Sequence, residues 1–277
     1  MDSSAARPPR RVLVIGSSSK WRIATLRRYF TETDDSNTIV DHSIPRFNEF
    51  VTLSPDIDEK SIRRDVPEDL CLAIAEAKMD KILSLLSSTS NDEDAGTAPS
   101  SSQQQLLLKP LQELFSHAVE LSSPTSHHLG ETHPHHDAAE GQLEELWILT
   151  GDQVAVYDNI VREKPQSRDE NVAFLQSYRG SSVATVAGTV LVNVLRGKMN
   201  RQSKVNRTKT TFRSDLPDDV IHRVIDRGDS LQCCGSFVVD DVELREFIDS
   251  VEPSFNAVTG LDMIAVSDLM REMHNQQ

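Results

Sequence analysis

Residues 147–165 read WILTGDQVAVYDNIVREKP, and we expect the rest of the chain to be arranged around this stretch. It opens with a short apolar run that is typical of a buried strand, places Asp152 where that run ends, and continues as a second strand-like segment. Pro165 cannot donate to a β-ladder and favours a turn, so Lys164 is expected close to Asp152 across a tight connection. An acid, the Gln153 amide and a lysine around such a turn suit a site for phosphate and a metal ion. A strand that ends in an ordinary surface aspartate is the alternative, and this segment alone does not decide between the two.

The chain has 277 residues, a formal net charge of -14 and 38% hydrophobic residues. This hydrophobic content supports a core, and the length suits one large domain or two small ones. The negative charge argues against a surface that coats nucleic acid, so an enzyme acting on anions would need a local basic cleft. No apolar run reaches the roughly 18 residues that span a bilayer, and residues 1–11 lack the apolar core of a secretion signal. We therefore expect a cytoplasmic protein that binds neither a nucleic-acid duplex nor a membrane.

Cysteine and histidine do not form a clear site in the sequence. Cys71, Cys233 and Cys234 are too few and too badly spaced for a disulfide framework or a zinc site, which fits a reducing compartment. The adjacent pair reads as small buried hydrophobes, because no nearby motif supplies a histidine base. Five histidines between residues 127 and 136 could bind a transition metal, but a solvated polar loop is the simpler interpretation.

The segment after the first predicted strand suits an anion. Residues 12–15 (VLVI) read as a buried parallel strand, which runs through a serine-rich turn into a helix predicted over residues 23–30. Backbone N–H groups and the positive end of the helix dipole attract phosphate at such a turn. Lys20 and Arg22 add positive charge, and Trp21 offers a flat surface on which a base could stack. The Walker pattern GxxxxGK[ST] is missing here, so a serine-rich helix cap without a ligand is the alternative.

An acidic cluster follows a strand or loop near residues 50–53. The segment from Asp56 to Glu59 holds three carboxylates in four residues, and such oxygen-rich clusters hold magnesium or manganese beside phosphates. Acidic residues also crowd helix starts, and a helix with one apolar face is predicted over residues 67–86. Lys78 belongs to this helix, where most lysines are solvated.

Residues 87–145 differ from their surroundings. They are rich in Ser, Thr, Gln, Asp and His, and we interpret them as a largely disordered insertion. Apolar residues over 106–121 have helical spacing, which predicts an amphipathic helix or a partner-binding motif there. Beyond the central stretch we expect helices over 167–178, 215–226 and 263–273, and strands over 183–195 and 207–213. A basic loop carrying Lys198, Arg201 and Lys204 would join the two strands.

These segments together resemble the Maf (septum-formation inhibitor) family of nucleoside triphosphate pyrophosphatases, over nearly the whole chain apart from the first ten residues and the insertion. No single motif is specific to this family, but the occurrence of so many of its motifs in the family's order is. The matching motifs are Ser17 to Arg22, Asp56 to Glu59, Ala75 to Lys78, Gly151 to Gln153, Glu163 to Pro165, Cys234 to Phe237 and Val258 to Leu261.

The resemblance implies an α/β fold in a single elongated domain over residues 11–277, with residues 1–10 as a flexible tail. It implies a mixed twisted sheet and a cleft between two lobes, an architecture shared with inosine triphosphate pyrophosphatases. It further implies hydrolysis of a nucleoside triphosphate to the monophosphate and pyrophosphate, assisted by magnesium or manganese, and a homodimer, because related proteins often pair. By the same resemblance the catalytic residues would be Asp152 and Lys164, the metal ligands Glu59 and Asp152, and the substrate-binding residues Ser17, Ser19, Trp21, Arg22, Lys78, Gln153 and Asp240.

Three departures from the family pattern bear on the substrate. Trp21, Gln153 and Asp240 resemble the Maf branch that acts on 7-methyl-GTP rather than the branch that acts on dTTP and UTP. A methylated guanine is cationic, so Trp21 could stack on it and Asp240 could pair with its donor edge.

Other departures, at Lys20, Ala24 and Ala187, keep a second hypothesis open. The chain would then be a non-catalytic regulatory or scaffold protein on the same fold, which recruits partners through residues 87–145.

Overall fold

The computed structural model describes residues 10–31, 44–88, 102–120, 144–253, 255–258 and 261–276. Within these ranges the chain forms a seven-stranded sheet in the order β2-β1-β3-β5-β6-β7, with β4 paired to β3. The strands are β1 (Arg10–Gly16), β2 (Glu49–Leu53), β3 (Glu144–Tyr157), β4 (Ile160–Arg162), β5 (Ser182–Leu195), β6 (Lys198–Phe212) and β7 (Ile248–Glu252). β1 is parallel to β2 and β3, and the other pairings are antiparallel, so the sheet is mixed.

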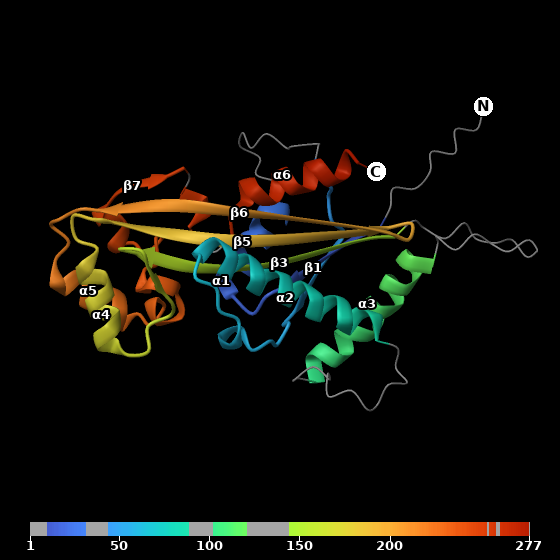
Figure 1. Ribbon diagram of the computed structural model, residues 1–277, viewed down its shortest axis with the longest axis horizontal. Coiled ribbons are helices and arrows are strands. Elements are labelled where there is room, and N and C mark those ends of the chain that lie inside the picture. Colours follow the sequence, from blue (N-terminus) through green and yellow to red (C-terminus); the bar gives the residue numbers. More distant parts are fainter. Residues whose placement is uncertain are drawn as a thin grey trace, which may run out of the picture.

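The helices are α1 (Lys20–Thr31), α2 (Pro67–Ser87), α3 (Ser102–Glu120), α4 (Arg168–Ser177), α5 (Asp218–Asp226) and α6 (Met263–His274). Short 3-10 turns are η1 (Glu59–Ser61), η2 (Ser230–Gln232), η3 (Cys234–Ser236), η4 (Leu244–Phe247) and η5 (Phe255–Ala257). Figure 1 shows an elongated molecule built along the long strands β3, β5 and β6, with α4 and α5 at one end and α3 at the other. The α/β fold in one elongated domain, predicted above, is confirmed.

Helices cover both faces of the sheet because its central strands are apolar on both. In β1 and the first half of β3, even-numbered side chains pack against α2 and α3, and odd-numbered side chains pack against α1 and α6. α6 accordingly lies across the sheet from α2 and α3 (Figure 1). At the other end, α4, α5 and the turns after them enclose a separate apolar cluster on the odd-numbered face of β3 and β5. These two packed regions are the lobes that the resemblance implied.

One edge of β3 is interrupted. β1 pairs with β3 only as far as Gly16 opposite Thr150, and β4 begins its pairing at Ala155 opposite Arg162. Among the described strands, none pairs with residues 151–154 on this edge, although β5 pairs with them on the other edge. We call these four residues the β3 window. Strand β1 ends here because the chain turns at Ser17, whose N–H donates to Ile15 O at 3.1 Å.

The prediction that Asp152 stands at a strand end is wrong, because β3 continues through it to Tyr157. Asp152 lies opposite Gly188 of β5 in the middle of the ladder. What ends near Asp152 is the neighbouring strand β1. A two-residue turn, Asp158-Asn159, then reverses the chain into β4, with positive φ angles of 51° and 61° at its two residues.

The predicted basic loop is also wrong. Lys198, Arg201 and Lys204 belong to β6, which pairs with β5 from its first residue. The connection is only Arg196-Gly197, two residues with positive φ angles of 49° and 72°. A run of polar residues suggests a loop in the sequence. Here it forms a strand, and at least half of the side chains of this strand reach solvent.

Part of the region interpreted as a disordered insertion is ordered. α3 matches the amphipathic helix expected over residues 106–121, and its apolar face packs on α2 through Leu111, Leu114, Phe115 and Ala118. The Gln112 side chain donates to the Leu85 and Ser88 carbonyls at 2.8 and 2.9 Å. The histidine-rich segment and the first nine residues lie outside the described residues. No helix in the described ranges is both long and apolar enough to span a membrane.

Candidate active site

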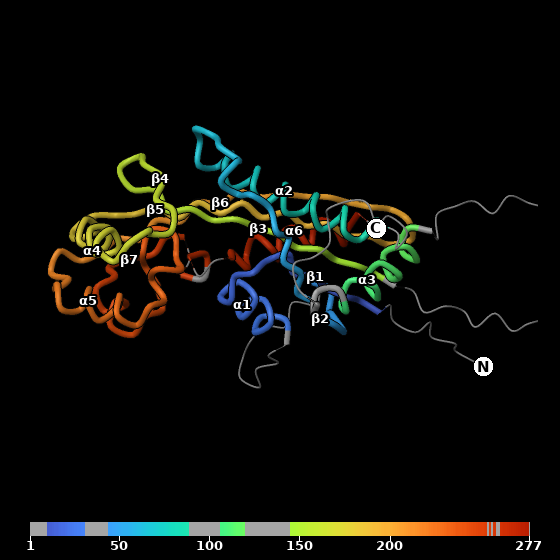
Figure 2. The backbone as a smooth tube through the Cα atoms, turned by 90° about the horizontal axis from the view of Figure 1, so that it is seen from below, coloured from blue at the N-terminus to red at the C-terminus, as the bar shows by residue number. Residues whose placement is uncertain are grey.

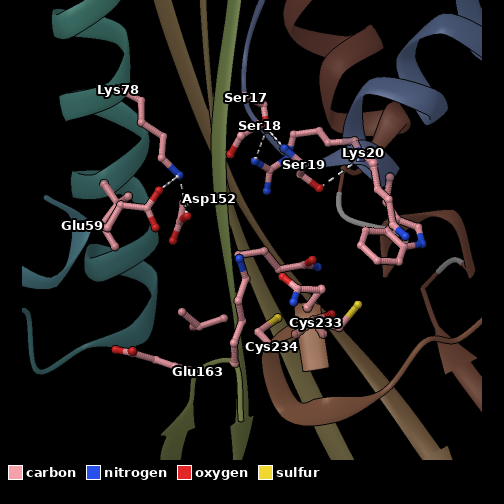
Figure 3. Close-up of a pocket in the computed structure, with 18 of the residues that line it drawn as sticks. Ser17, Ser18, Ser19, Lys20, Glu59, Lys78, Asp152, Glu163, Cys233 and Cys234 are labelled. Atoms are coloured by element: carbon pink, nitrogen blue, oxygen red, sulfur yellow. Dashed lines mark hydrogen bonds and ion pairs between the residues drawn. The ribbon is translucent and has the colours of Figure 1, made fainter. Parts of the chain in front are cut away.

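A cavity of about 820 Å³ opens at the β3 window, between the two lobes. Its walls come from the turn before α1, the segment between β2 and α2, α2 itself, the β4–α4 connection and η2–η3 (Figure 3). All ten predicted site residues line it, namely Ser17, Ser19, Trp21, Arg22, Glu59, Lys78, Asp152, Gln153, Lys164 and Asp240. The fold thus brings together side chains that are up to 223 residues apart in the chain.

Lys78 joins the two predicted metal-binding acids. Its ammonium nitrogen lies 2.9 Å from Asp152 Oδ1 and 2.7 Å from Glu59 Oε1, and it donates to Gly151 O at 3.5 Å (Figure 3). Helix α2 places Lys78 there because its apolar face, including Ala75, Met79 and Ile82, packs on the sheet. Burial raises the pKa of Asp152, and the charges of Lys78 and Arg22 oppose that shift. Asp152 is therefore a largely buried carboxylate, with 12% of its side chain exposed and a cation fixed at one oxygen.

Arg22 ties the start of α1 to the window. Its Nη1 donates to Gly151 O at 2.8 Å and to Ser17 Oγ at 3.2 Å. Ser19 precedes α1 and acts as its N-cap, since Ser19 Oγ accepts from the Arg22 backbone N–H at 3.4 Å. Burial lowers the pKa of Arg22, while the Asp152 charge opposes this. The helix N-terminus and a buried guanidinium thus point at the same gap in the sheet.

The cavity reaches both faces of β3 because neighbouring side chains of a strand point to opposite faces. Asp152 and Val154 lie on the face covered by α2, where Val154 packs with Leu70 and Ile74. Gln153 lies on the other face with Ala155, which packs in the apolar cluster of the second lobe. In Figure 3, Lys78, Glu59 and Asp152 accordingly lie on one side of β3, and Ser17, Lys20 and Cys233 lie on the other.

The family model described as Maf-like protein matches residues 12–273. The chain belongs to the Maf family. It is 25% identical over 264 residues to a 7-methyl-GTP pyrophosphatase of Dictyostelium discoideum, covering 95% of this chain and 98% of the relative. It is 27% identical over 126 residues to a dTTP/UTP pyrophosphatase of Chlorobium luteolum, covering 46% of this chain and 63% of the relative. A 7-methyl-GTP pyrophosphatase of Aromatoleum aromaticum is 29% identical over 126 residues, covering 45% of this chain and 62% of the relative.

The metal that the Maf resemblance implies fits the residues present. Glu59 and Asp152 supply hard oxygen donors that both contact the Lys78 ammonium nitrogen, so the two carboxylates lie close enough to share a small cation. Among the described residues no group of three or more His, Cys, Asp or Glu side chains forms a ready metal cage. A pair of carboxylates suits magnesium, which is often held by one or two carboxylates together with substrate phosphates.

Several lining residues of this Maf protein were not predicted. Lys60, Arg63, Glu163 and Thr185 all line the cavity. Arg63 Nη2 lies 3.7 Å from Glu163 Oε1, which joins the loop after η1 to the end of the β4 hairpin. These two segments project from the same side of the molecule in Figure 2. Glu163 belongs to the matched motif Glu163 to Pro165 but was given no role, whereas the positions of the other three depend on how distant loops and strands meet.

The cysteines of this Maf protein do not form a nucleophilic centre. All three are free, and Cys233 and Cys234 line the cavity. Burial raises the pKa of each of these two thiols to about 12, so both are neutral thiols near pH 7. Cys233 and Cys234 are both partly exposed, so their interpretation as small buried hydrophobes is not confirmed.

Proposed function

We propose that this Maf protein is a nucleoside triphosphate pyrophosphatase that acts on 7-methyl-GTP, giving the nucleoside monophosphate and pyrophosphate. The observation that carries the proposal is the cluster of Lys78, Asp152 and Glu59 beside the Arg22 turn, inside one cavity. The names of the relatives support the reaction class, and those names include both 7-methyl-GTP and dTTP/UTP. None of those relatives has a name that supports a non-catalytic scaffold. A cytoplasmic location and a homodimer stay predictions.

The triphosphate would lie along the cationic side chains at the window. Ser17, Ser19 and the α1 N-terminus offer hydrogen bonds, and Arg22, Lys78 and Lys164 offer positive charge. Pyrophosphate is a highly charged leaving group, so these cations stabilise the charge that develops on it. A divalent ion held by Glu59 and Asp152 would add a Lewis acid that polarises the phosphoryl oxygens.

Asp152 is the proposed general base. A water molecule attacks one phosphorus, the bond between that phosphorus and the oxygen bridging the α- and β-phosphates breaks, and Asp152 accepts the proton of the water. Burial raises the pKa of Asp152, which makes it a stronger base than an exposed aspartate. Lys78 binds Asp152 Oδ1 and so fixes the orientation of the carboxylate.

The base would stack on Trp21. The Lys20 ammonium nitrogen lies 4.2 Å from the centroid of this ring, so the ring already engages a cation through its face. A 7-methylguanine base carries a positive charge and would likewise be attracted to an electron-rich indole ring. Asp240 is exposed at the cavity and would accept hydrogen bonds from the donor edge of the base.

The test is pyrophosphate release from a panel of 7-methyl-GTP, GTP, dTTP, UTP and ATP with magnesium or manganese. We expect turnover, with the highest kcat/KM for 7-methyl-GTP, and a loss of at least about 100-fold in kcat for Asp152→Asn. Asp158→Asn is the matched control, because it removes the same charge from the β3–β4 turn, where a positive φ also suits Asn. Failure to release pyrophosphate from any nucleotide, or full turnover by Asp152→Asn, would refute the proposal and favour the scaffold hypothesis.

A further inference from the structure

Two polar atoms in the cavity wall lack a partner. Among the described residues that line the cavity, only Gln153 Nε2 and Thr185 Oγ1 are buried side-chain atoms with no hydrogen bond. Thr185 is 3% exposed, so solvent does not satisfy its hydroxyl. A buried donor without an acceptor destabilises the free protein, and a ligand that supplies the acceptor removes that penalty.

The two side chains lie on the same face of the sheet. Thr185 lies opposite Ala155 in the β3–β5 register, and side chains that are directly opposite in an antiparallel pair share a face. Gln153 is two residues from Ala155 on β3, so it shares that face too and is the diagonal neighbour of Thr185. A glutamine is long enough to meet a common partner across that diagonal.

Part of this face of the cavity suits a flat ring. Phe237, Val239 and Val258 line it, and all three belong to the apolar cluster of the second lobe. Asp152 and Lys78 lie on the opposite face of β3. The apolar part of the cavity wall therefore lies on the face of Gln153 and Thr185, next to the charged groups at the start of α1.

We propose that Thr185 is a specificity-determining residue, which together with Gln153 donates hydrogen bonds to a carbonyl oxygen on the edge of the bound base. A keto oxygen has two lone pairs and accepts from both donors, whereas an exocyclic amino group turns its own hydrogens toward the glutamine NH2. The site would thus select oxo bases, such as guanine, hypoxanthine and uracil, over amino bases, such as adenine and cytosine. This inference rests on the proposed function and adds the chemical class of the base.

Other unpaired threonines give the inference a matched control. Thr189 lies four residues along β5, on the same face as Thr185, is 0% exposed and also has an unpaired hydroxyl. It does not line the cavity. Replacing either residue by valine removes one hydroxyl at almost constant volume, but only Thr185 lines the cavity.

The experiment compares kcat/KM for ITP against ATP and for UTP against CTP, two pairs in which an oxo group replaces an amino group. We expect Thr185→Val to lower both oxo-to-amino ratios by roughly fivefold to tenfold, which corresponds to one lost hydrogen bond. Thr189→Val should leave them at the wild-type value, and Thr185→Ser should restore them because it keeps the hydroxyl. Thr185→Ala removes the same hydroxyl with a smaller side chain and replaces the valine variant if that variant does not fold.

Equal ratios for wild type, Thr185→Val and Thr189→Val would overturn the inference while leaving the pyrophosphatase proposal intact. If the wild type hydrolyses no nucleotide, the proposed function fails instead. The same four nucleotides are then compared by calorimetric binding, where an oxo-to-amino preference that Thr185→Val removes and Thr189→Val keeps supports the role of Thr185, and any other pattern overturns it.

Discussion

Asp152 is a buried carboxylate, and its ionisation links the site to the stability of the fold. Burial raises its pKa in the folded protein above the ordinary value of 3.8. Between the unfolded and folded pKa values the folded state binds more protons than the unfolded state. The stabilising contribution of this group is therefore complete below the unfolded pKa and decreases as the pH rises through the folded pKa.

We expect this effect in protein kept free of divalent ions. The free energy of unfolding of the wild type, relative to that of Asp152→Asn, should decrease from acidic pH toward neutral pH. Urea denaturation of both proteins across that range, with a chelator present, measures the difference. Lys78 and Arg22 act in the opposite direction, so a difference that grows with pH would mean that their attraction outweighs burial.

At the scale of elements, the approach of α2 to the sheet fixes the position of Lys78. A Cβ atom on Gly188 would lie 2.7 Å from Cys71 C and from Leu72 N in the α2 backbone, closer than real side chains come. Gly188 also lies opposite Asp152 in the ladder. The glycine therefore lets the helix that carries Lys78 reach the strand that carries Asp152.

Gly188→Ala should push α2 away from the sheet. We expect a loss of about 1–3 kcal/mol in the free energy of unfolding, and at least a tenfold lower kcat/KM for folded protein, because Lys78 moves relative to Asp152. Gly228→Ala is the control. A Cβ atom at this position meets nothing within 4 Å, so the alanine is strained only by the φ angle of +85°. Denaturation curves with rate assays check both variants, and unchanged kinetics in Gly188→Ala would show that α2 stays in place.

Helix α3 provides a second test at this scale, because the partner-motif hypothesis and the packing seen here predict different results. Phe115 is 8% exposed in the cluster that α3 forms with α2, whereas Leu106 on the same helix is 77% exposed. Phe115→Ala should lower the free energy of unfolding by about 3 kcal/mol, and Leu106→Ala by less than about 0.5 kcal/mol. None of the described residues of α3 lines the cavity, so kcat of the folded protein should be unchanged in both. Equal stability of the two variants would mean that α3 does not pack on α2 in solution.

Local sequence patterns predicted which helices and strands exist more reliably than they predicted where each one begins and ends. The spacing of apolar residues placed α2, α4, α6, β1 and β5 within a few residues of their observed bounds. An element that buries a face has apolar residues at regular spacing, and this spacing can be found in the sequence. The prediction began β6 at residue 207 instead of Lys198, because polar, solvent-facing strand residues resemble a loop. The place of Asp152 was misjudged because the end of its neighbour β1, which opens the window, depends on pairing between distant segments.

The site residues also fall into two groups: those that local motifs predicted and those that depend on pairing between distant segments. Residues such as Ser17, Lys78 and Asp152 were named from motifs, because the chemistry of phosphate restricts the residue types that can serve. Thr185 could not be found from the sequence, because the face it occupies follows from the β3–β5 register. A threonine in an alternating strand looks the same whether it faces a ligand or the core.

At the scale of the whole molecule, the charge of the cavity differs from that of the chain. The protein carries a formal charge of -14, while the cavity is lined by six Lys or Arg and five Asp or Glu side chains. The local basic cleft expected from the sequence is therefore only weakly basic among the described residues. A triphosphate with a charge of about -4 would meet a nearly neutral wall inside a negative molecule, and electrostatic attraction alone would hold it weakly.

This balance predicts that a divalent ion contributes to nucleotide binding as well as to the chemical step. We expect calorimetry with a 7-methyl-GTP analogue that cannot be cleaved between its α- and β-phosphates to give a Kd at least about tenfold tighter with magnesium or manganese than with a chelator. The effect should disappear for the monophosphate, which lacks the β- and γ-oxygens, and should weaken in Glu59→Gln, which loses one carboxylate but keeps Asp152. Equal affinity with and without the ion would mean that Arg22, Lys78 and Lys164 alone offset the charge of the triphosphate. Glu59 would then serve only to position Lys78, whose ammonium nitrogen lies 2.7 Å from Glu59 Oε1.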